Sequence, residues 1–178
     1  MRTKTFRVEQ TVPRARERIF SFFEKAENLA LITPRWLDFR VLSASPVEVY
    51  QGRVIDYQIR LSGVAIHWRS LISRYDPPRS FVDEQLVGPY ALWRHLHLFE
   101  SVSGGTRLVD QVEYRLPSWL PGRSAETIDR IYTRPRLERI FAYRKLIFAD
   151  MFGNELSVDT GLAGRTDETH TLETEPCA

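Results

Sequence analysis

Four ionisable side chains in the middle of the sequence could share one chemical task. His95 and His97 are two residues apart, and Asp83 and Asp110 flank them along the chain. Side chains two positions apart on a β-strand point to the same face, about 7 Å from each other. Two imidazoles and a carboxylate can ligate a metal ion, and an imidazole held by a carboxylate can act as a general base. In a buried hydrogen-bond network each carboxylate would instead orient or charge its neighbouring imidazole. We expect this network, with no metal ion and no cofactor.

The residues around this group alternate between apolar and polar types in short runs. Residues 55–116 contain five such runs separated by turn signals, which predicts five consecutive antiparallel strands. The turn at Ser62-Gly63, the turn at Gly104-Gly105 and the corners at 76–78 and 88–90 set the expected register. The facing pairs that follow are Tyr57 with Trp68, Ser70 with Asp83, Asp83 with His95, Gln85 with Trp93, His95 with Tyr114, His97 with Val112 and Phe99 with Asp110. One row across four strands would therefore read Ser70, Asp83, His95 and Tyr114.

One face of this predicted sheet is too polar for an ordinary core and too aromatic for an open surface. An aromatic-lined pocket with a few polar groups inside is the simplest interpretation, although any single ring is more often plain core than a ligand contact. The residues expected to bind a ligand are Tyr57, Trp68, Phe81, Asp83, Gln85, Trp93, His95, His97, Phe99, Asp110 and Tyr114.

The flanking segments supply the remaining elements. A strand is predicted over 5–12, a helix over 14–26, a short helix over 28–32 and a strand over 39–43. A long amphipathic helix is predicted from Ser124, its expected N-cap, to Phe148, with Pro135 kinking it or shifting its phase. Arg144 on this helix would reach a sheet carboxylate or a ligand anion, or its stem would simply cover the edge of the core.

Composition sets the wider limits. The 178 residues, 43% of them hydrophobic, suit one domain over residues 1–152. Residues 153–178 carry six acidic residues and one arginine, and we expect a disordered acidic tail there. The rest of the chain is basic, but its arginines are scattered, so no nucleic-acid surface is expected. The one cysteine, Cys177, excludes an internal disulfide and a cysteine-based zinc site. No run is long enough for a membrane span, and the expected location is the cytoplasm.

Several short motifs along the chain form a recognisable set. They are LITP at 31–34, GRVIDY at 52–57, HW at 67–68, FVDEQ at 81–85, GPY at 88–90, WRHLHLF at 93–99, GT at 105–106, DQVEYRLP at 110–117 and IFAYR at 140–144. These segments resemble the SRPBCC superfamily, which includes START domains, polyketide cyclases and the major birch-pollen allergen. The similarity covers roughly residues 3 to 150 and is strongest to a bacterial subgroup of ligand-binding-like proteins. Members of that subgroup are sometimes joined to, or encoded near, sugar-nucleotide-epimerase-like proteins.

The resemblance implies an α+β helix-grip fold, in which a curved antiparallel sheet of about seven strands wraps a long C-terminal helix. Two short helices would follow the first strand, and a deep apolar cavity would lie between the sheet and the long helix. The helical histidine pattern with which the ring-hydroxylating branch of the superfamily binds iron is absent from this sequence.

These observations leave three hypotheses about function. We expect the protein to bind or carry a small hydrophobic molecule, of lipid, polyketide or aromatic type. The second hypothesis is a cyclase or dehydratase that uses His95 with Asp83 and Tyr114 as its acid/base group. The third is a protein-interaction module whose core is filled by side chains. An exposed sheet edge would also permit a homodimer.

Overall fold

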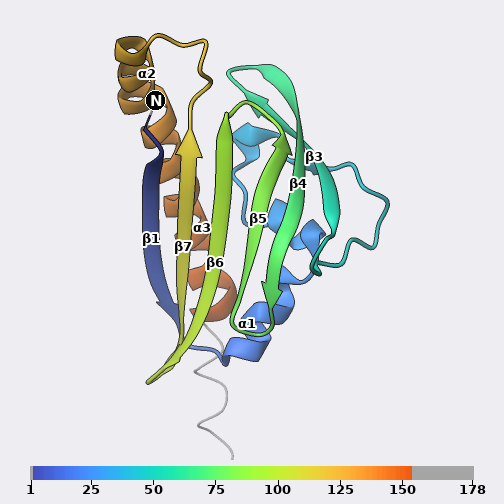
Figure 1. Cartoon of the computed structure of the whole chain (residues 1–178). Coiled ribbons are helices and arrows are strands. Elements are labelled where there is room, and N and C mark those ends of the chain that lie inside the picture. Colours follow the sequence, from blue (N-terminus) through green and yellow to red (C-terminus); the bar gives the residue numbers. More distant parts are fainter. Residues whose placement is uncertain (1, 154–178) are drawn as a thin grey trace, which may run out of the picture.

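The computed structural model describes residues 2–153, which form one seven-stranded antiparallel sheet with helices packed against it (Figure 1). The strand order across the sheet is β1-β7-β6-β5-β4-β3-β2. Each strand from β3 to β6 pairs with the next strand in sequence, because short turns join them, and β7 pairs with β1 at its other edge. The elements are β1 (Lys4–Val12), α1 (Arg16–Phe23), η1 (Ala26–Ala30), η2 (Arg35–Leu37), β2 (Arg40–Val41), β3 (Val54–Leu61), β4 (Val64–Asp76), β5 (Ser80–Val87), β6 (Leu92–Val102), β7 (Gly105–Arg115), α2 (Gly122–Ile128), η3 (Asp129–Thr133) and α3 (Arg134–Gly153).

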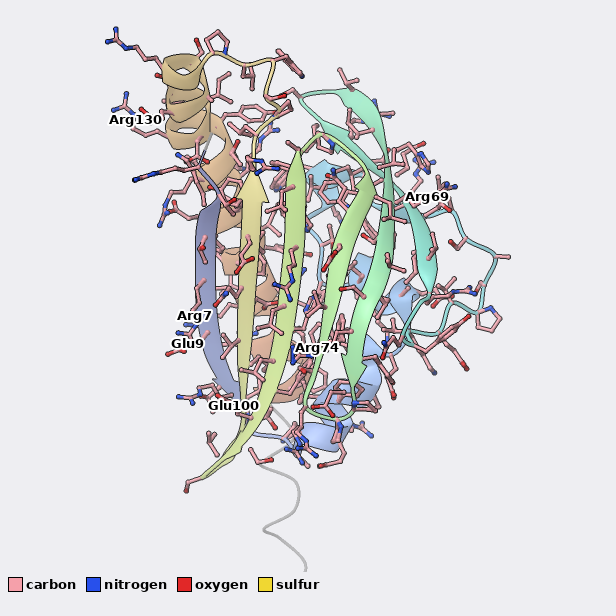
Figure 2. All side chains as sticks on the ribbon, viewed as in Figure 1. Arg7, Glu9, Arg69, Arg74, Glu100 and Arg130 are labelled. Atoms are coloured by element: carbon pink, nitrogen blue, oxygen red, sulfur yellow. The ribbon has the colours of Figure 1, made fainter. Side chains whose placement is uncertain are left out.

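The two faces of the sheet differ in character, as alternation along the strands requires. The outer face, toward the viewer in Figure 2, carries charged side chains such as Arg7, Glu9, Arg74 and Glu100. The inner face carries most of the buried residues and is covered by α1 and α3, which lie behind the sheet in Figure 1. None of the helices within residues 2–153 combines the length and hydropathy that a membrane crossing requires.

Two of the predicted hairpin registers are confirmed. Tyr57 pairs with Trp68 across β3 and β4, and Asp83 pairs with His95 across β5 and β6. The first of these hairpins turns at Ser62-Gly63 and the second at Gly88-Pro89. Glycine and proline in such short turns fix the register of the strands on either side.

The predicted register between β6 and β7 is wrong by two residues. Val102 pairs with Gly105, so His97 faces Asp110 instead of Val112, and His95 faces Val112 instead of Tyr114. Gly105 is the first residue of β7, and it has to be glycine because a Cβ there would lie 2.1 Å from a backbone oxygen of β1. The glycine pair therefore serves a close backbone approach as well as a turn. A shift of two residues keeps every side chain on its predicted face.

The predicted register between β4 and β5 is also wrong by two residues. Ser70 faces Gln85, and Ile72 faces Asp83, because the pairing shifts on either side of Ser70–Ile72. These irregularities are bulges, which alternation in the sequence does not reveal. The row that contains Asp83 and His95 therefore reads Ile72, Asp83, His95, Val112 and Phe6, and not the predicted Ser70, Asp83, His95 and Tyr114.

The helical segments differ from prediction mainly at their ends. Pro121 is the N-cap of α2, so Ser124 lies inside the helix and caps nothing. The phase shift expected at Pro135 is present as the π-helical turn η3, in which Arg134 N–H donates to the Asp129 carbonyl five residues back. The helix expected over 14–26 is shorter, and the next one is the 3-10 turn η1. The strand expected over 39–43 is reduced to β2. The expected tail, apart from Gly153 at the end of α3, lies outside the described residues.

Candidate functional site

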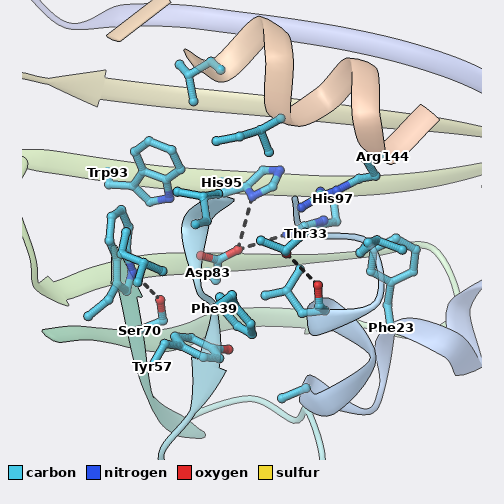
Figure 3. A pocket seen from close by; sticks show the side chains of 18 of the residues that line it. Phe23, Thr33, Phe39, Tyr57, Ser70, Asp83, Trp93, His95, His97 and Arg144 are labelled. Atoms are coloured by element: carbon cyan, nitrogen blue, oxygen red, sulfur yellow. Dashed lines mark hydrogen bonds and ion pairs between the residues drawn. The ribbon is translucent and has the colours of Figure 1, made fainter. Parts of the chain in front are cut away.

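A pocket of about 190 Å³ lies between the inner face of the sheet, the η1–η2 segment and the start of α3 (Figure 3). Strands β3 to β6 supply one wall, and α1, η1 and η2 supply the opposite one. The apolar residues that line it include Phe22, Phe23, Ala26, Leu29, Ile32, Leu37, Phe39, Val49, Tyr57, Ile59, Leu61, Trp68, Ile72, Phe81, Tyr90, Trp93, Leu137 and Ile140.

One corner of this pocket is polar and is built from facing strand residues. Asp83 on β5 lies opposite His95 on β6, and Asp110 on β7 lies opposite His97. His95 Nε2 lies 2.8 Å from Asp110 Oδ1, and His97 Nε2 lies 3.0 Å from Asp83 Oδ2. The second nitrogen of each ring faces the other carboxylate, at 3.6 Å for His95 Nδ1 to Asp83 and 3.2 Å for His97 Nδ1 to Asp110. Each imidazole therefore bridges the same two carboxylates.

The two imidazoles are held by packing as well as by charge. Their centroids lie 3.7 Å apart, and the Phe81 ring stacks on His97 at 4.1 Å. Both histidines are almost fully buried. His97 Nδ1 is close to Asp110 but not aligned for a hydrogen bond, so this contact is Coulombic.

Arg144 on α3 completes the group from the helix side. Its Nη1 lies 3.3 Å from Asp110 Oδ1, and its guanidinium stands over the Phe141 ring. The side chain is 6% exposed, so the prediction that it reaches a sheet carboxylate is confirmed.

The pKa shifts follow from burial and from these contacts. Burial would raise the pKa of Asp110, but the charge of Arg144 and the contacts with the His95 and His97 imidazoles outweigh it and hold this pKa well below its usual value. The pKa of Asp83 is lowered because His97 and His95 likewise outweigh its burial. Burial and the nearby charge of His97 lower the pKa of His95. The two carboxylates outweigh burial at His97 and raise its pKa.

Seven of the eleven predicted ligand-binding residues line the pocket, namely Tyr57, Trp68, Phe81, Asp83, Trp93, His95 and His97. The other four do not. The Gln85 side chain forms hydrogen bonds with the backbone of Tyr90, and Phe99 packs on Phe20 and Phe23 in the core. Asp110 contacts the two imidazoles but does not line the pocket. Tyr114 lies opposite Trp93 instead of His95, and its hydroxyl donates a 2.6 Å hydrogen bond to Asp129. The acid/base group predicted for the enzyme hypothesis is therefore not assembled at Tyr114.

The pocket residues that the sequence reasoning missed come from the helical wall and from the segment that leads into α3. The wall residues Ala26, Leu29 and Ile32 repeat at helical spacing, which was visible in the sequence but is equally typical of plain core. Tyr132 and Arg136 also line the pocket, and both contact Ser62 in the β3–β4 turn: the Ser62 hydroxyl lies 2.8 Å from the Tyr132 hydroxyl and accepts a 3.1 Å hydrogen bond from Arg136. No local pattern indicates a contact across 70 residues.

No protein-family profile matches this sequence, and no curated protein matches it. Solved structures do match. The di-domain ARO/CYC StfQ from the steffimycin biosynthetic pathway is 18% identical, with a TM-score of 0.69 over 88% of this chain and 52% of StfQ. The ZhuI aromatase/cyclase from Streptomyces sp. R1128 is 15% identical, with a TM-score of 0.67 over 90% of this chain and 100% of ZhuI.

A third match is Ara h 8.0201, which is 14% identical, with a TM-score of 0.54 over 83% of this chain and 99% of that protein. Identities this low establish likeness of fold and not of activity. The chain therefore has the helix-grip fold, as its motifs predicted.

Proposed function

We propose that this protein binds a small, largely apolar molecule that has one polar end. The observation that carries the proposal is the pocket, in which apolar and aromatic walls predominate and Asp83, His95 and His97 together form a polar corner. Pockets that orient small molecules combine predominantly apolar linings with a few placed polar groups. The third hypothesis, an interaction module with a filled core, predicts no such space.

The size of the pocket favours a compact ligand. An engineered apolar cavity of about 150 Å³ takes up benzene, and this pocket measures about 190 Å³. One or two fused rings fit this space, whereas a long acyl chain would require the pocket to widen. Among the lipid, polyketide and aromatic classes, we therefore favour a small aromatic or short polyketide-like molecule.

The polar corner fixes the orientation of such a ligand. Tyr57 lies near Asp83, whose charge adds to burial in raising the pKa of the phenol, so Tyr57 stays neutral and can donate a hydrogen bond. The imidazoles offer either a donor or an acceptor. A ligand with a carboxylate, phenol or ketone at one end would place that group here and its rings against Trp68 and Trp93, which form an edge-to-face pair at 5.1 Å.

Calorimetric titration with 2-naphthoate, naphthalene and palmitate tests the proposal. We expect 2-naphthoate to bind in a 1:1 ratio and palmitate to bind more weakly. Ile59→Trp, which fills the pocket, should abolish the heat of binding, and Val64→Trp, on an exposed site of the adjacent strand, should leave it unchanged. Equal binding by both variants would show that the ligand occupies another site.

A cyclase or dehydratase is the second candidate. The geometry that favours it is the His95 imidazole, which is held by Asp110 and opens onto a pocket with apolar walls. In that case His95→Gln would abolish turnover of a cyclisable substrate while ligand affinity stays largely intact. Equal loss of both would support binding alone.

A further inference from the structure

The polar corner of the pocket also has the donors of a metal site. Asp83, His95 and His97 each offer a ligand atom, and these atoms all lie within 4.8 Å of one another. All three residues line the pocket, so an ion held there would keep coordination positions open toward it. We propose that Asp83, His95 and His97 bind one divalent transition-metal ion at the polar corner of the pocket.

The distances between the donor atoms support this proposal. Tetrahedral zinc with metal–nitrogen bonds of 2.0–2.1 Å places neighbouring ligand atoms about 3.3 Å apart. Asp83 Oδ2 lies 3.0 Å from His97 Nε2 and 3.6 Å from His95 Nδ1, on either side of that value. The two rings are tilted by 38° and would have to open further for both nitrogens to point at one ion.

Asp110 occupies the place of a carboxylate that orients metal-binding histidines. Such histidines almost always present their other ring nitrogen to a carboxylate or a carbonyl, which fixes the tautomer. His95 Nε2 lies 2.8 Å and His97 Nδ1 lies 3.2 Å from the same Asp110 oxygen. The His95 contact is a hydrogen bond, whereas the His97 ring would have to turn slightly to form one. With protons on these two nitrogens, the lone pairs of His95 Nδ1 and His97 Nε2 both face Asp83.

The charges also favour a cation. With both imidazoles neutral, Asp83, Asp110 and Arg144 leave one uncompensated negative charge in a buried group. A buried charge requires a partner, which is either one proton or one metal ion. A divalent ion would leave a net charge of +1, so its open positions would prefer an anionic oxygen such as the carboxylate or phenolate of a ligand. The ion and the ligand's polar end would then occupy the same corner.

Another histidine–aspartate pair provides a matched control. His67 Nε2 lies 2.7 Å from Asp56 Oδ1 on the outer face of the sheet, with the histidine side chain 48% exposed. This pair is shorter than any contact in the cluster, but it has one imidazole and an arginine on its carboxylate. It should bind metal weakly or not at all.

The test is a calorimetric titration of the full chain with Zn²⁺, without any organic ligand. His170→Ala and Cys177→Ala form the background, because both residues are potential ligands outside the described part of the chain. We expect one ion per chain. Asp83→Asn, His95→Gln and His97→Gln should each lower the affinity by more than about a hundredfold, Asp110→Asn by about ten- to a hundredfold, and His67→Gln by less than about twofold. A loss below about tenfold in any of the three ligand variants would overturn the proposal.

A second measurement needs no substitution in the cluster, and so covers the case in which a variant fails to fold. In the background protein loaded with Co²⁺, proton NMR should show two strongly shifted, solvent-exchangeable imidazole N–H signals, from the nitrogens that face Asp110. Fewer than two such signals would refute the assignment of Asp83, His95 and His97 as metal ligands. The charge of the buried group would then be balanced by a proton instead of a metal ion. Because neither measurement uses 2-naphthoate, failure of the metal site and failure of the ligand pocket are distinguishable.

Discussion

Replacing Arg144 by methionine tests how much the buried ion pair between Arg144 on α3 and Asp110 on β7 stabilises the folded protein. Methionine keeps most of the stem and removes the guanidinium, which leaves Asp110 without its cation from the helix side. Both side chains of this pair are at most 10% exposed, so water cannot replace the lost partner.

The structure sets the size of the effect. Breaking a buried ion pair by removing one partner costs about 3–5 kcal/mol. The buried cation–π contact of Arg144 with Phe141 is lost as well, but a methionine sulfur makes a favourable contact with an aromatic ring that offsets this loss. The 3.3 Å distance and the two imidazoles that remain at Asp110 argue for the lower end of the range. We expect a loss of about 3 kcal/mol, which corresponds to a fall in Tm of about 6–12 °C for a chain of this size.

Urea unfolding followed by circular dichroism measures this loss. The matched control is Arg69→Met, because Arg69 lies 2.8 Å from Asp56 in a pair whose side chains are 45% and 25% exposed. A surface pair contributes about 0–1 kcal/mol despite its shorter distance. The double variant Arg144→Met/Asp110→Asn should recover at least half of the loss, because the unpaired charge is gone. If Arg69→Met costs as much as Arg144→Met, or if the double variant recovers nothing, burial is not the source of the effect.

Three further substitutions test other parts of the fold. Tyr114→Phe removes the 2.6 Å hydrogen bond to the buried carboxylate of Asp129 and should cost about 1–3 kcal/mol in urea unfolding; a loss below about 0.5 kcal/mol would contradict the role of this bond. Gly105→Ala places a Cβ 2.1 Å from a β1 carbonyl oxygen at a φ of +145° and should cost more than about 2 kcal/mol, so an unchanged Tm would show that β1 does not approach Gly105 so closely. The hydrogen bond from Arg69 holds the pKa of Asp56 below its ordinary 3.8 against its slight burial. A depressed carboxyl pKa stabilises the folded state above that value, so the stability difference between wild type and Asp56→Asn should shrink as the pH falls from 6 to 3, and a difference that grows would reverse the sign of this linkage.

The sequence was sufficient to predict the fold because the alternation of apolar and polar residues recurs in several consecutive strands and tolerates errors in the register. Alternation over β3 to β7 placed Asp83, His95, His97 and Asp110 on one face, and errors of two residues in two hairpins did not change that face. Which of these residues touch one another did depend on the register, so the facing of His97 and Asp110 became visible only in the structure.

The site was predicted less completely than the fold, for two physical reasons. A strand pattern gives the face of a side chain but not its rotamer, and Tyr114 shows the difference because its hydroxyl reaches Asp129 on η3. The opposite wall of the pocket comes from helical turns, whose apolar residues are indistinguishable in sequence from ordinary core. Contacts such as Ser62 with Tyr132 join segments 70 residues apart and have no local signature.

The π-helical turn η3 sets which residues of α3 meet the sheet. Its wider turn takes up one residue more than an α-helix would, and one residue corresponds to about 100° of rotation. Deleting a residue between 129 and 133 would turn the inward face of α3 by that angle and carry Arg144 away from Asp110. A homologue with a regular helix here would therefore align with a one-residue gap, and a different helix position would supply its partner for the sheet carboxylate.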